Sequence, residues 1–316
     1  MNNQNTQFQV KYIKTKNKLR KIITYKNEFP DIKMQHEKIA SFIYDNFIPS
    51  KFTKAYVKNR SIYHNAISHM YNDIFISLDI KDFFHNINHK LLINALFHEL
   101  NIQEKDTINK LECGMIVSKS SISKKGLPLG LITSPILSNV YLKEFDNILY
   151  GKLKKMTLKN VIYTRYADDL VISFKEDILI DSKTKVDNIS TVISIVKLLL
   201  SRYKLKLNSS KTKIISFEKS NHVKITGVNI VRDSFNHRKL SVGRKLKNNL
   251  FHKAIKYYEE KNRNKIDIMK IKGHESFILS IEKKDYEEVY SLNMKNKIKE
   301  LGFESLHELI KSLYYE

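Results

Sequence analysis

The stretch Val161–Phe174, VIYTRYADDLVISF, constrains the fold of this chain more than any other. Two apolar runs rich in β-branched and aromatic residues, Val161–Tyr166 and Leu170–Phe174, flank a short break that holds Asp168 and Asp169. Such runs favour strands, so the pattern predicts a β-hairpin with two acids at its turn. A turn that serves only solubility more often carries Gly or Asn. Two adjacent carboxylates need a counter-cation, and magnesium, which prefers hard oxygen ligands, suits them; the alternative is a solvated turn.

An alternating strand earlier in the chain carries a third acid. In Ile74–Ile80, IFISLDI, apolar side chains at the even positions alternate with the side chains at the odd positions, which is the period of a β-strand. If the even positions face the core, Asp79 stands on the opposite, open face of the sheet. Only a fold that pairs this strand with the hairpin brings the three acids together.

The rest of the chain has the pattern of an α+β protein, and only 8 Gly and 4 Pro interrupt its elements. A strongly basic hairpin is expected over residues 8–25, with its turn at Lys14–Lys18. Apolar residues recur at helical spacing in several further segments. The predicted helices cover residues 32–47, 90–118, 135–149, 186–203 and the basic region from 244 onward. The remaining predicted elements are a strand, a turn and a strand over 205–217, with Lys211 at the turn, and a single strand over 223–231.

A loop rich in Gly and Pro precedes the predicted helix at 135–149. Gly126, Pro128 and Gly130 lie in this loop, and glycine allows the backbone to approach a flat ligand closely.

The charge of the chain points to a polyanionic partner. It has 56 Lys and Arg against 33 Asp and Glu, which gives a net charge of +23. Such a surplus favours nucleic acid or an anionic membrane surface. The membrane alternative is the weaker one, because the N-terminus has no apolar signal core and the apolar run near 192–200 is broken by Lys197. The single cysteine, Cys113, excludes an intramolecular disulfide, and the chain as a whole suits a reducing cytoplasm.

The order of these features resembles the palm of a reverse transcriptase. Tyr166–Asp169, YADD, is similar to the YxDD signature of that family, Asp79–Phe84, DIKDFF, to its first catalytic strand, and Leu127–Pro135 to its template-contacting loop. The resemblance implies an α+β right-hand polymerase whose palm is an antiparallel sheet with helices. The implied domains are fingers and N-terminal region in 1–72, palm with part of the fingers in 73–235, including a template and nucleotide loop at 119–135, and a basic helical thumb in 236–316.

Three further segments narrow the resemblance to the retron reverse transcriptases of bacteria. Asn65–His69, NAISH, resembles the NAxxH element of those enzymes, Ile225–Gly227, ITG, resembles their VTG element, and Gly273–Ser280 resembles their thumb. Such an enzyme copies part of a cognate structured non-coding RNA into DNA that stays attached to it. The resemblance therefore implies dNTPs and this RNA as partners, together with a separate effector protein that acts in anti-phage defence.

The resemblance also implies a two-metal site for Mg²⁺, for which Mn²⁺ can substitute. Asp79 and Asp168 would bridge the two ions, Asp169 would be the third acid, and the carbonyl of Ile80 would add an oxygen. Lys211 matches the lysine that protonates pyrophosphate, and its alternative is an exposed turn lysine.

Other residues match the substrate-binding positions of the family. Arg20, with Lys14 or Lys16, would grip the triphosphate, since arginine binds phosphate through two parallel hydrogen bonds. Phe84 would exclude the ribose 2′-hydroxyl, and its alternative is core packing, as for Phe83. Leu129, beside Gly130, stands where these enzymes often have glutamine for the nucleotide. The expected primer and template contacts are Tyr166, Pro128 and Ser134.

The remaining candidates are structural residues or contacts to RNA. Asn65 and His69 are expected to form a polar corner rather than to act in catalysis. The other members of this group are Thr226 and Gly227 in the ITG element and the thumb lysines Lys245, Lys247 and Lys253. Basic helices suit an RNA stem, which proteins contact through phosphates and 2′-hydroxyls.

Two alternatives to a retron enzyme stay open. One is another defence-associated reverse transcriptase, of the abortive-infection or template-independent type. The other is an inert polymerase fold that only binds RNA. The three acids and Lys211 argue against the second, because clustered carboxylates repel phosphate.

Overall fold

A computed structural model of the chain describes residues 7–15, 18–102, 107–177, 182–261 and 264–313. The chain divides into two compact units, and each unit is made of two separate stretches of the sequence. The first comprises Met1–Ser61 and Asn72–Ile215, and the second comprises Ile62–Tyr71 and Ser216–Glu316.

An antiparallel sheet lies at the centre of the first unit. Its strand order is β4-β5-β3-β6, and the elements are β3 (Ile74–Asp79), β4 (Ile162–Tyr166), β5 (Asp169–Phe174) and β6 (Lys213–Ser216). The predicted hairpin is β4 and β5, and β3 pairs with β5 so that Asp79 lies opposite Asp169. The sequence pattern predicted the strands, whereas the pairing joins segments that are far apart in the chain.

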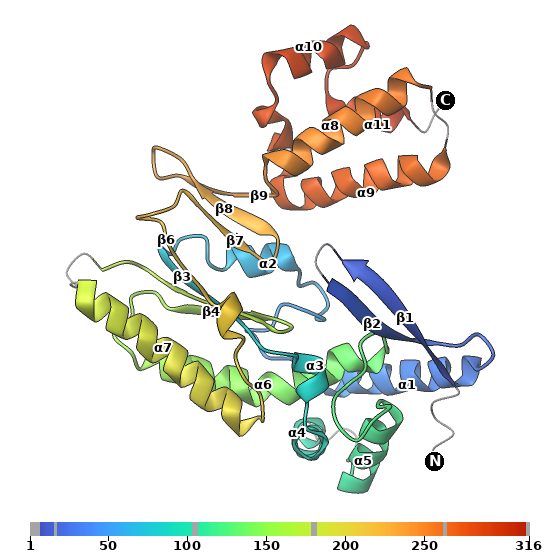
Figure 1. Cartoon of the computed structure of the whole chain (residues 1–316), viewed down its shortest axis with the longest axis vertical. Coiled ribbons are helices and arrows are strands. Elements are labelled where there is room, and N and C mark those ends of the chain that lie inside the picture. The colour runs from blue at the N-terminus through green and yellow to red at the C-terminus, as the bar shows by residue number, and fades with distance from the viewer. Residues whose placement is uncertain (1–6, 16–17, 103–106, 178–181, 262–263, 314–316) are drawn as a thin grey trace. The chain divides into compact units, whose positions relative to one another are not determined.

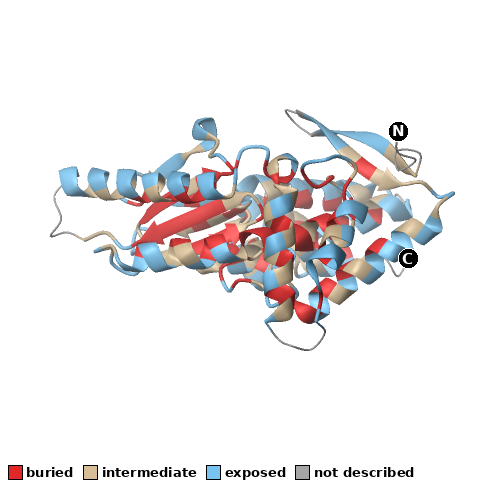
Figure 2. Ribbon diagram, turned by 90° about the horizontal axis from the view of Figure 1, so that it is seen from below, coloured by how far each residue is buried: buried red, intermediate tan, exposed pale blue. Residues whose placement is uncertain are grey.

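Helices cover the sheet, and the core lies between them and the strands. The helices of this unit are α1 (Pro30–Asn46), the short α3 (Phe83–Asn86), α4 (His89–Asn101), α5 (Lys110–Lys119), α6 (Thr133–Lys154) and α7 (Ser182–Arg202). Ile76, Leu142, Phe145 and Val196 are fully buried in one cluster, and the strands stand out as buried in Figure 2. Phe75 is buried as well, so the open sheet face expected from alternation is wrong at that position: both faces of β3 are covered.

The single helix expected over residues 90–118 is two helices, α4 and α5. Asn101 ends the first one, since its side chain donates to the carbonyl of Phe97 and bonds the backbone of Ile108. Asn109 then caps α5 in a capping box with Glu112. Side chains that bond the backbone compete with helix continuation, which periodicity of apolar residues does not detect.

The basic N-terminal hairpin forms as predicted. Strands β1 (Phe8–Thr15) and β2 (Lys18–Tyr25) pair along their whole length, and Figure 1 shows them as two neighbouring dark-blue strands. The amide of Ile23 donates to the carbonyl of Leu129 at 2.7 Å, so the hairpin is attached to the Gly-Pro loop.

Two predicted strand segments differ in the structure. In 205–217 the first strand is only an isolated bridge between Leu207 and Ile80, followed by the 3₁₀ turn η2 (Ser209–Lys211) and then β6. The single strand expected over 223–231 is a hairpin, because Thr226 and Gly227 both have positive φ, 45° and 95°, and reverse the chain. Apolar and polar side chains keep alternating across a two-residue turn, so the pattern of residues 223–231 predicts one strand.

The second unit combines a small sheet with a helical region. Strands β7 (His222–Ile225), β8 (Val228–Arg232) and β9 (Arg238–Ser241) form the sheet, and α2 (Ile62–Ile67) packs on it. Helices α8 (Arg244–Glu259), α9 (Lys265–Glu282), α10 (Leu292–Glu300) and α11 (Leu306–Ser312), with the 3₁₀ segment η3 (Lys283–Val289), enclose a second apolar core. Among the described residues, none of the helices has the length and apolarity needed to cross a membrane.

Candidate active site

Three aspartates meet at one end of the central sheet. Asp79 is the last residue of β3, Asp169 is the first residue of β5, and these two are register partners. Asp168 precedes Asp169 in the turn after β4, and its carbonyl accepts a hydrogen bond from the amide of Ile80 at 2.9 Å. The predicted constellation is therefore assembled by strand pairing. Asp79 is only 8% exposed, and Asp168 and Asp169 are half-buried, so the three acids do not form a fully solvated turn.

The turn between β4 and β5 has an unusual backbone. Tyr166 pairs with Asp169, which leaves Ala167 and Asp168 as the two residues of the turn. Ala167 has φ 57°, in the left-handed region where a residue with a Cβ is disfavoured relative to glycine. This conformation holds the two carboxylates beside each other at the start of β5, and strain of this kind concentrates at functional sites.

Lys211 reaches the acids from the end of η2. Its ammonium contacts Oδ1 of Asp79 at 2.5 Å, although half of its side chain is exposed. The amide of Asn208 donates to the carbonyl of Asp79 at 2.8 Å, which attaches the segment before η2 to the end of β3. The Asp79 hydrogen bond raises the pKa of Lys211, so this lysine is held in its protonated form.

The two carboxylates of the hairpin are protonated more readily than usual. Burial first, and then the neighbouring charges of Asp168 and Asp79, raise the pKa of Asp169 to about 6. Burial and the Asp79 charge likewise raise the pKa of Asp168, while Lys211 and Arg20 lower it. Burial, more than the neighbouring charges, therefore makes the ionised form of these two carboxylates costly.

We expect Asp169→Asn to stabilise the fold in metal-free buffer at neutral pH. Folding raises the pKa of Asp169, so the folded protein is most stable relative to the unfolded chain below about pH 4, where this carboxyl is protonated in both states. This stability is lost as the pH rises through about 6 and the buried carboxylate ionises. The gain at pH 7.5 should be about 1–2 kcal/mol after discounting for solvent screening, and it should vanish near pH 4. Urea unfolding of both proteins across this pH range measures the difference. Asp187→Asn, on the exposed side of α7, is the matched control and should change nothing; an equal gain there would contradict the assignment.

The chemistry of the donor set fits a divalent cation. Carboxylate oxygens are hard ligands, and burial together with the neighbouring carboxylate charges raises the pKa values of Asp168 and Asp169, so a bound cation would favour their ionised forms. Among the described residues, no group of three or more His, Cys, Asp or Glu side chains forms a metal site as it stands, and Lys211 occupies one oxygen of Asp79. Asp79, Asp168 and Asp169 are the residues that would hold such an ion.

Arg20 and the Gly-Pro loop lie on the same unit as the acids. Arg20 is exposed on β2, close enough for its charge to lower the pKa of Asp168. Gly130 has φ 107°, and a Cβ on it would come within 2.4 Å of the carbonyl oxygen of Ile23. Leu129 is half-buried and binds β2 through its carbonyl. Of the two predicted lysine alternatives, Lys14 is exposed, and Lys16 lies outside the described residues.

Pro128 and Ser134, for which primer or template contacts are expected, lie in the Gly-Pro loop and at the start of α6 respectively. Both residues are buried, and the Ser134 hydroxyl donates to the Pro128 carbonyl at 2.7 Å. This bond braces the loop from within, while the contacts of both residues with primer or template stay a prediction. Tyr166, by contrast, is half-exposed beside Asp169.

The two phenylalanines after the first catalytic strand lie on α3. Phe83 is 2% exposed and Phe84 is 9% exposed, and their rings lie 5.2 Å apart between centroids. Both belong to the main core cluster. The core alternative therefore applies to Phe83, while Phe84 is slightly more exposed and its role as a gate stays a prediction.

The remaining candidates lie in the second unit. Asn65 and His69 are fully buried, and Asn65 donates to the Thr226 hydroxyl at 3.1 Å. The NAISH and ITG segments thus meet within this unit, where the first supports the turn at Thr226 and Gly227, which fits the structural role.

The thumb lysines divide into two kinds. Lys245 and Lys253 are exposed on α8. Lys247 is 2% exposed and pairs with Glu282 at 2.7 Å, so the RNA contact expected for it is corrected: it is a structural residue. The available sign of its burial in the sequence was that Leu250 and Phe251 follow it at helical spacing.

Two groups beside the acids were not recognised in the sequence. The first is Tyr56, which has φ 58°; burial and the charge of Asp168 raise its pKa, which places it near the hairpin turn. The second is the pair of Arg165 and Asp146, both completely buried behind the turn. A charged residue inside an apolar strand was the available signal for Arg165.

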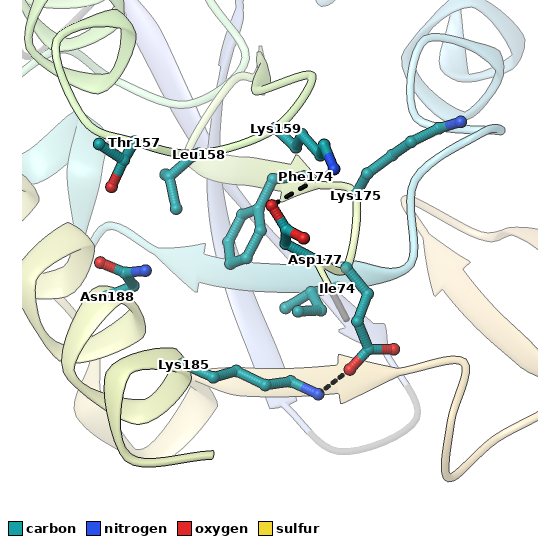
Figure 3. Close-up of a pocket in the computed structure, with 10 residues that line it drawn as sticks. Ile74, Thr157, Leu158, Lys159, Phe174, Lys175, Asp177, Lys185 and Asn188 are labelled. Atoms are coloured by element: carbon teal, nitrogen blue, oxygen red, sulfur yellow. Dashed lines mark hydrogen bonds and ion pairs between the residues drawn. The ribbon is translucent and has the colours of Figure 1, made fainter. Parts of the chain in front are cut away.

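A small pocket at the other end of the sheet is separate from this site. Figure 3 shows it around Ile74 and Phe174, at the ends of β3 and β5 far from the acids. Lys159 pairs with Asp177 there at 3.3 Å, and Lys185 pairs with Glu176. Its volume of about 20 Å³ is that of a water site, so it has no room for a nucleotide.

Comparison with known proteins agrees with this geometry. The family described as Reverse transcriptase (RNA-dependent DNA polymerase) matches residues 13–230. The retron Ec73 reverse transcriptase of Escherichia coli is 36% identical over 122 residues, which are 38% of this chain and 39% of that protein. The retron Ec83 enzyme of the same species is 29% identical over 72% of this chain and 69% of its own length. The retron Ec86 enzyme is 28% identical over 81% and 74% respectively.

A solved structure shows the same fold. Telomerase from Candida albicans, in complex with a fragment of telomeric RNA, aligns with a TM-score of 0.52 at 10% identity, over 98% of this chain and 66% of that one. The mixed helices and antiparallel sheets thus form a right-hand polymerase, as predicted. With the aspartate hairpin inside the matched segment, the chain belongs to the reverse transcriptase (RNA-dependent DNA polymerase) family and is of the bacterial retron type.

Proposed function

We propose that this protein copies part of a cognate structured RNA into DNA at the three aspartates, using Mg²⁺. The observation that carries the proposal is the meeting of Asp79, Asp168 and Asp169 with Lys211 at one end of the sheet. A protein that only binds RNA gains nothing from carboxylates that repel phosphate. The relatives named as retron reverse transcriptases support an RNA template and dNTPs as substrates.

The reaction joins a primer hydroxyl to the α-phosphorus of a dNTP and releases pyrophosphate. Asp79, Asp168 and Asp169 would hold a pair of Mg²⁺ ions, which would supply the Lewis acidity that lowers the pKa of the hydroxyl and stabilises the leaving group. The Asp79 contact raises the pKa of Lys211 and so keeps it protonated, and we assign Lys211 as the group that gives a proton to the pyrophosphate oxygen. Arg20 binds the triphosphate, and Leu129 and Gly130 support the nucleotide beside β2.

The rest of the assignment follows the retron relatives. We assign residues 1–72 to the fingers and N-terminal region, 73–235 to the palm with part of the fingers, and 236–316 to the thumb. The product is DNA joined to its RNA, made in the cytoplasm and used in anti-phage defence with a separate effector protein.

Sequencing of the nucleic acid that co-purifies with the protein tests the proposal. DNA covalently joined to a structured RNA, and complementary to part of it, is the expected result. Untemplated DNA would favour a template-independent defence enzyme instead. RNA without any DNA, together with no dNTP incorporation on added primed RNA, would mean an inert RNA-binding fold.

We expect the thumb to bind RNA through exposed lysines on α8. Lys245→Glu with Lys253→Glu should weaken binding about tenfold or more at low salt and reduce the slope of log affinity against log salt by about two, since each contact releases a counterion. Fluorescence anisotropy over a salt series measures both. Lys183→Glu with Lys197→Glu, two exposed lysines on α7, is the control with the same charge change. Equal losses from the two pairs would place the RNA grip elsewhere.

A further inference from the structure

A fully buried polar network lies directly behind the catalytic turn. Arg165 forms two parallel hydrogen bonds with Asp146, from Nε at 2.8 Å and from Nη2 at 2.9 Å. The Tyr163 hydroxyl donates to the same carboxylate at 2.7 Å. Tyr163 and Arg165 are two positions apart on β4, so their side chains lie on the same face of the strand, which packs against α6. Both charged side chains have 0% exposure.

The network also reaches a third segment of the chain. Arg165 Nη1 lies 3.3 Å from the side-chain oxygen of Asn139 on α6, which also accepts from the Thr53 hydroxyl. The backbone of Arg165 bonds the carbonyl of Phe52 and the amide of Lys54. The guanidinium is thus held by side chains of α6, and the backbone of Arg165 is held by residues 52–54.

Stability alone does not explain such a pair. Removing two charges from water costs several kcal/mol for each ion, and apolar residues of similar volume often stabilise a fold as well or better. A buried ion pair is useful where it sets one geometry among several. The direction of the remaining Arg165 donor therefore matters.

That donor points at the strained residue of the turn. Nη1 of Arg165 donates to the carbonyl of Ala167 at 3.3 Å. Ala167 is the residue with φ 57°, and the next residue is the catalytic acid Asp168. Asp168 is held in turn by the amide of Ile80 through its own carbonyl. The two peptide groups of the turn are thus anchored from opposite sides, one by Arg165 and one by β3.

We propose that Arg165, oriented by Asp146, is a positioning residue that holds Ala167 in its left-handed conformation and so aims the Asp168 carboxylate. Arg165 does not touch the substrate. This inference rests on the proposed polymerase function for its kinetic readout, but the backbone conformation of the turn can be measured without it. Misplacement of a reacting group by about 1 Å can cost about a hundredfold in rate, so a weak hydrogen bond at this point has a large effect.

The test separates positioning from stability by removing the network without leaving buried polar atoms. The variant combines Arg165→Met, Asp146→Leu and Tyr163→Phe. Its unfolding free energy should stay close to that of the wild type, while kcat for incorporation of one dNTP falls about thirtyfold and KM changes little. Addition of Ala167→Gly should restore at least about a fifth of the lost rate, because glycine adopts a positive φ without the penalty. The rate of the combined variant is compared with that of Ala167→Gly in the otherwise wild-type protein.

Hydrogen exchange gives a readout that does not depend on activity. Amides of the peptide spanning 166–169 should exchange faster in the apolar variant, while those of Val171–Ser173 stay protected. Arg165→Lys, which keeps the charge with fewer donors, serves if the triple variant does not fold, with the same rescue expected from Ala167→Gly.

The outcomes are distinct. A folded apolar variant with wild-type kcat and unchanged exchange at the turn overturns the inference, as does a loss of rate that Ala167→Gly leaves untouched. A wild-type protein that incorporates no dNTP on any primed RNA overturns the proposed function instead. In that case the hydrogen-exchange rates of the amides in residues 166–169 test the role of Arg165 without any activity measurement.

Discussion

Asp79→Asn and Asp168→Asn should each reduce dNTP incorporation by about a thousandfold or more while RNA affinity stays within about twofold. Asparagine keeps the shape of the side chain and removes the charge that a cation needs. The loss falls in the chemical step, because the charge that develops on the transferred phosphoryl group is then no longer neutralised. Single-turnover incorporation of one dNTP on primed RNA, with anisotropy for RNA binding, measures both effects.

The local sequence offers a close control for this experiment. Asp82 lies three residues after Asp79, is exposed, and has φ 47° at the start of α3. Asparagine tolerates this backbone conformation, so Asp82→Asn makes the same chemical change without a cost in folding. It should retain wild-type incorporation. Activity above a few per cent of wild type in both site variants would remove the aspartates from the chemistry.

Phe84→Ala should raise the use of rNTPs relative to dNTPs by about tenfold or more. If the ring fills the space beside C2′ of the incoming sugar, its removal makes room for a hydroxyl. If it is only a core residue, truncation costs about 3–5 kcal/mol of stability and affects both substrates alike. The ratio of kcat/KM for an rNTP to that for the matching dNTP separates the two roles, because loss of folded protein cancels in it.

Phe83→Ala is the matched control for the gate. Phe83 is the neighbouring ring on α3, belongs to the same core cluster and is the more buried of the two. Its truncation should lower stability at least as much as Phe84→Ala but leave the substrate ratio unchanged. An unchanged ratio in Phe84→Ala, or an equal change in Phe83→Ala, would assign Phe84 to packing alone. The three aspartates would be unaffected by that result.

Local patterns in the sequence determined which segments became strands and which carried the acids. The aspartate hairpin, the strand ending at Asp79 and the basic N-terminal hairpin all follow from alternation and β-propensity, which act between neighbouring residues. The same patterns failed where a side chain or a turn interrupted them. Asn101 divided a predicted helix, and Thr226 with Gly227 divided a predicted strand.

Tertiary structure alone decided what the charged residues do. Lys245 and Lys247 are two positions apart on one basic helix, yet the first is exposed and the second pairs with Glu282 in the interior, because the helix turns by 200° between them. In the sequence Arg165 is a single charge in an apolar strand, and only the packing of α6 shows that it pairs with Asp146. Asp79 and Asp169 became neighbours only through the register of β3 and β5. Partners of this kind come from distant segments, and burial, which sets the energy of each charge, is a property of the packed fold and not of any local stretch.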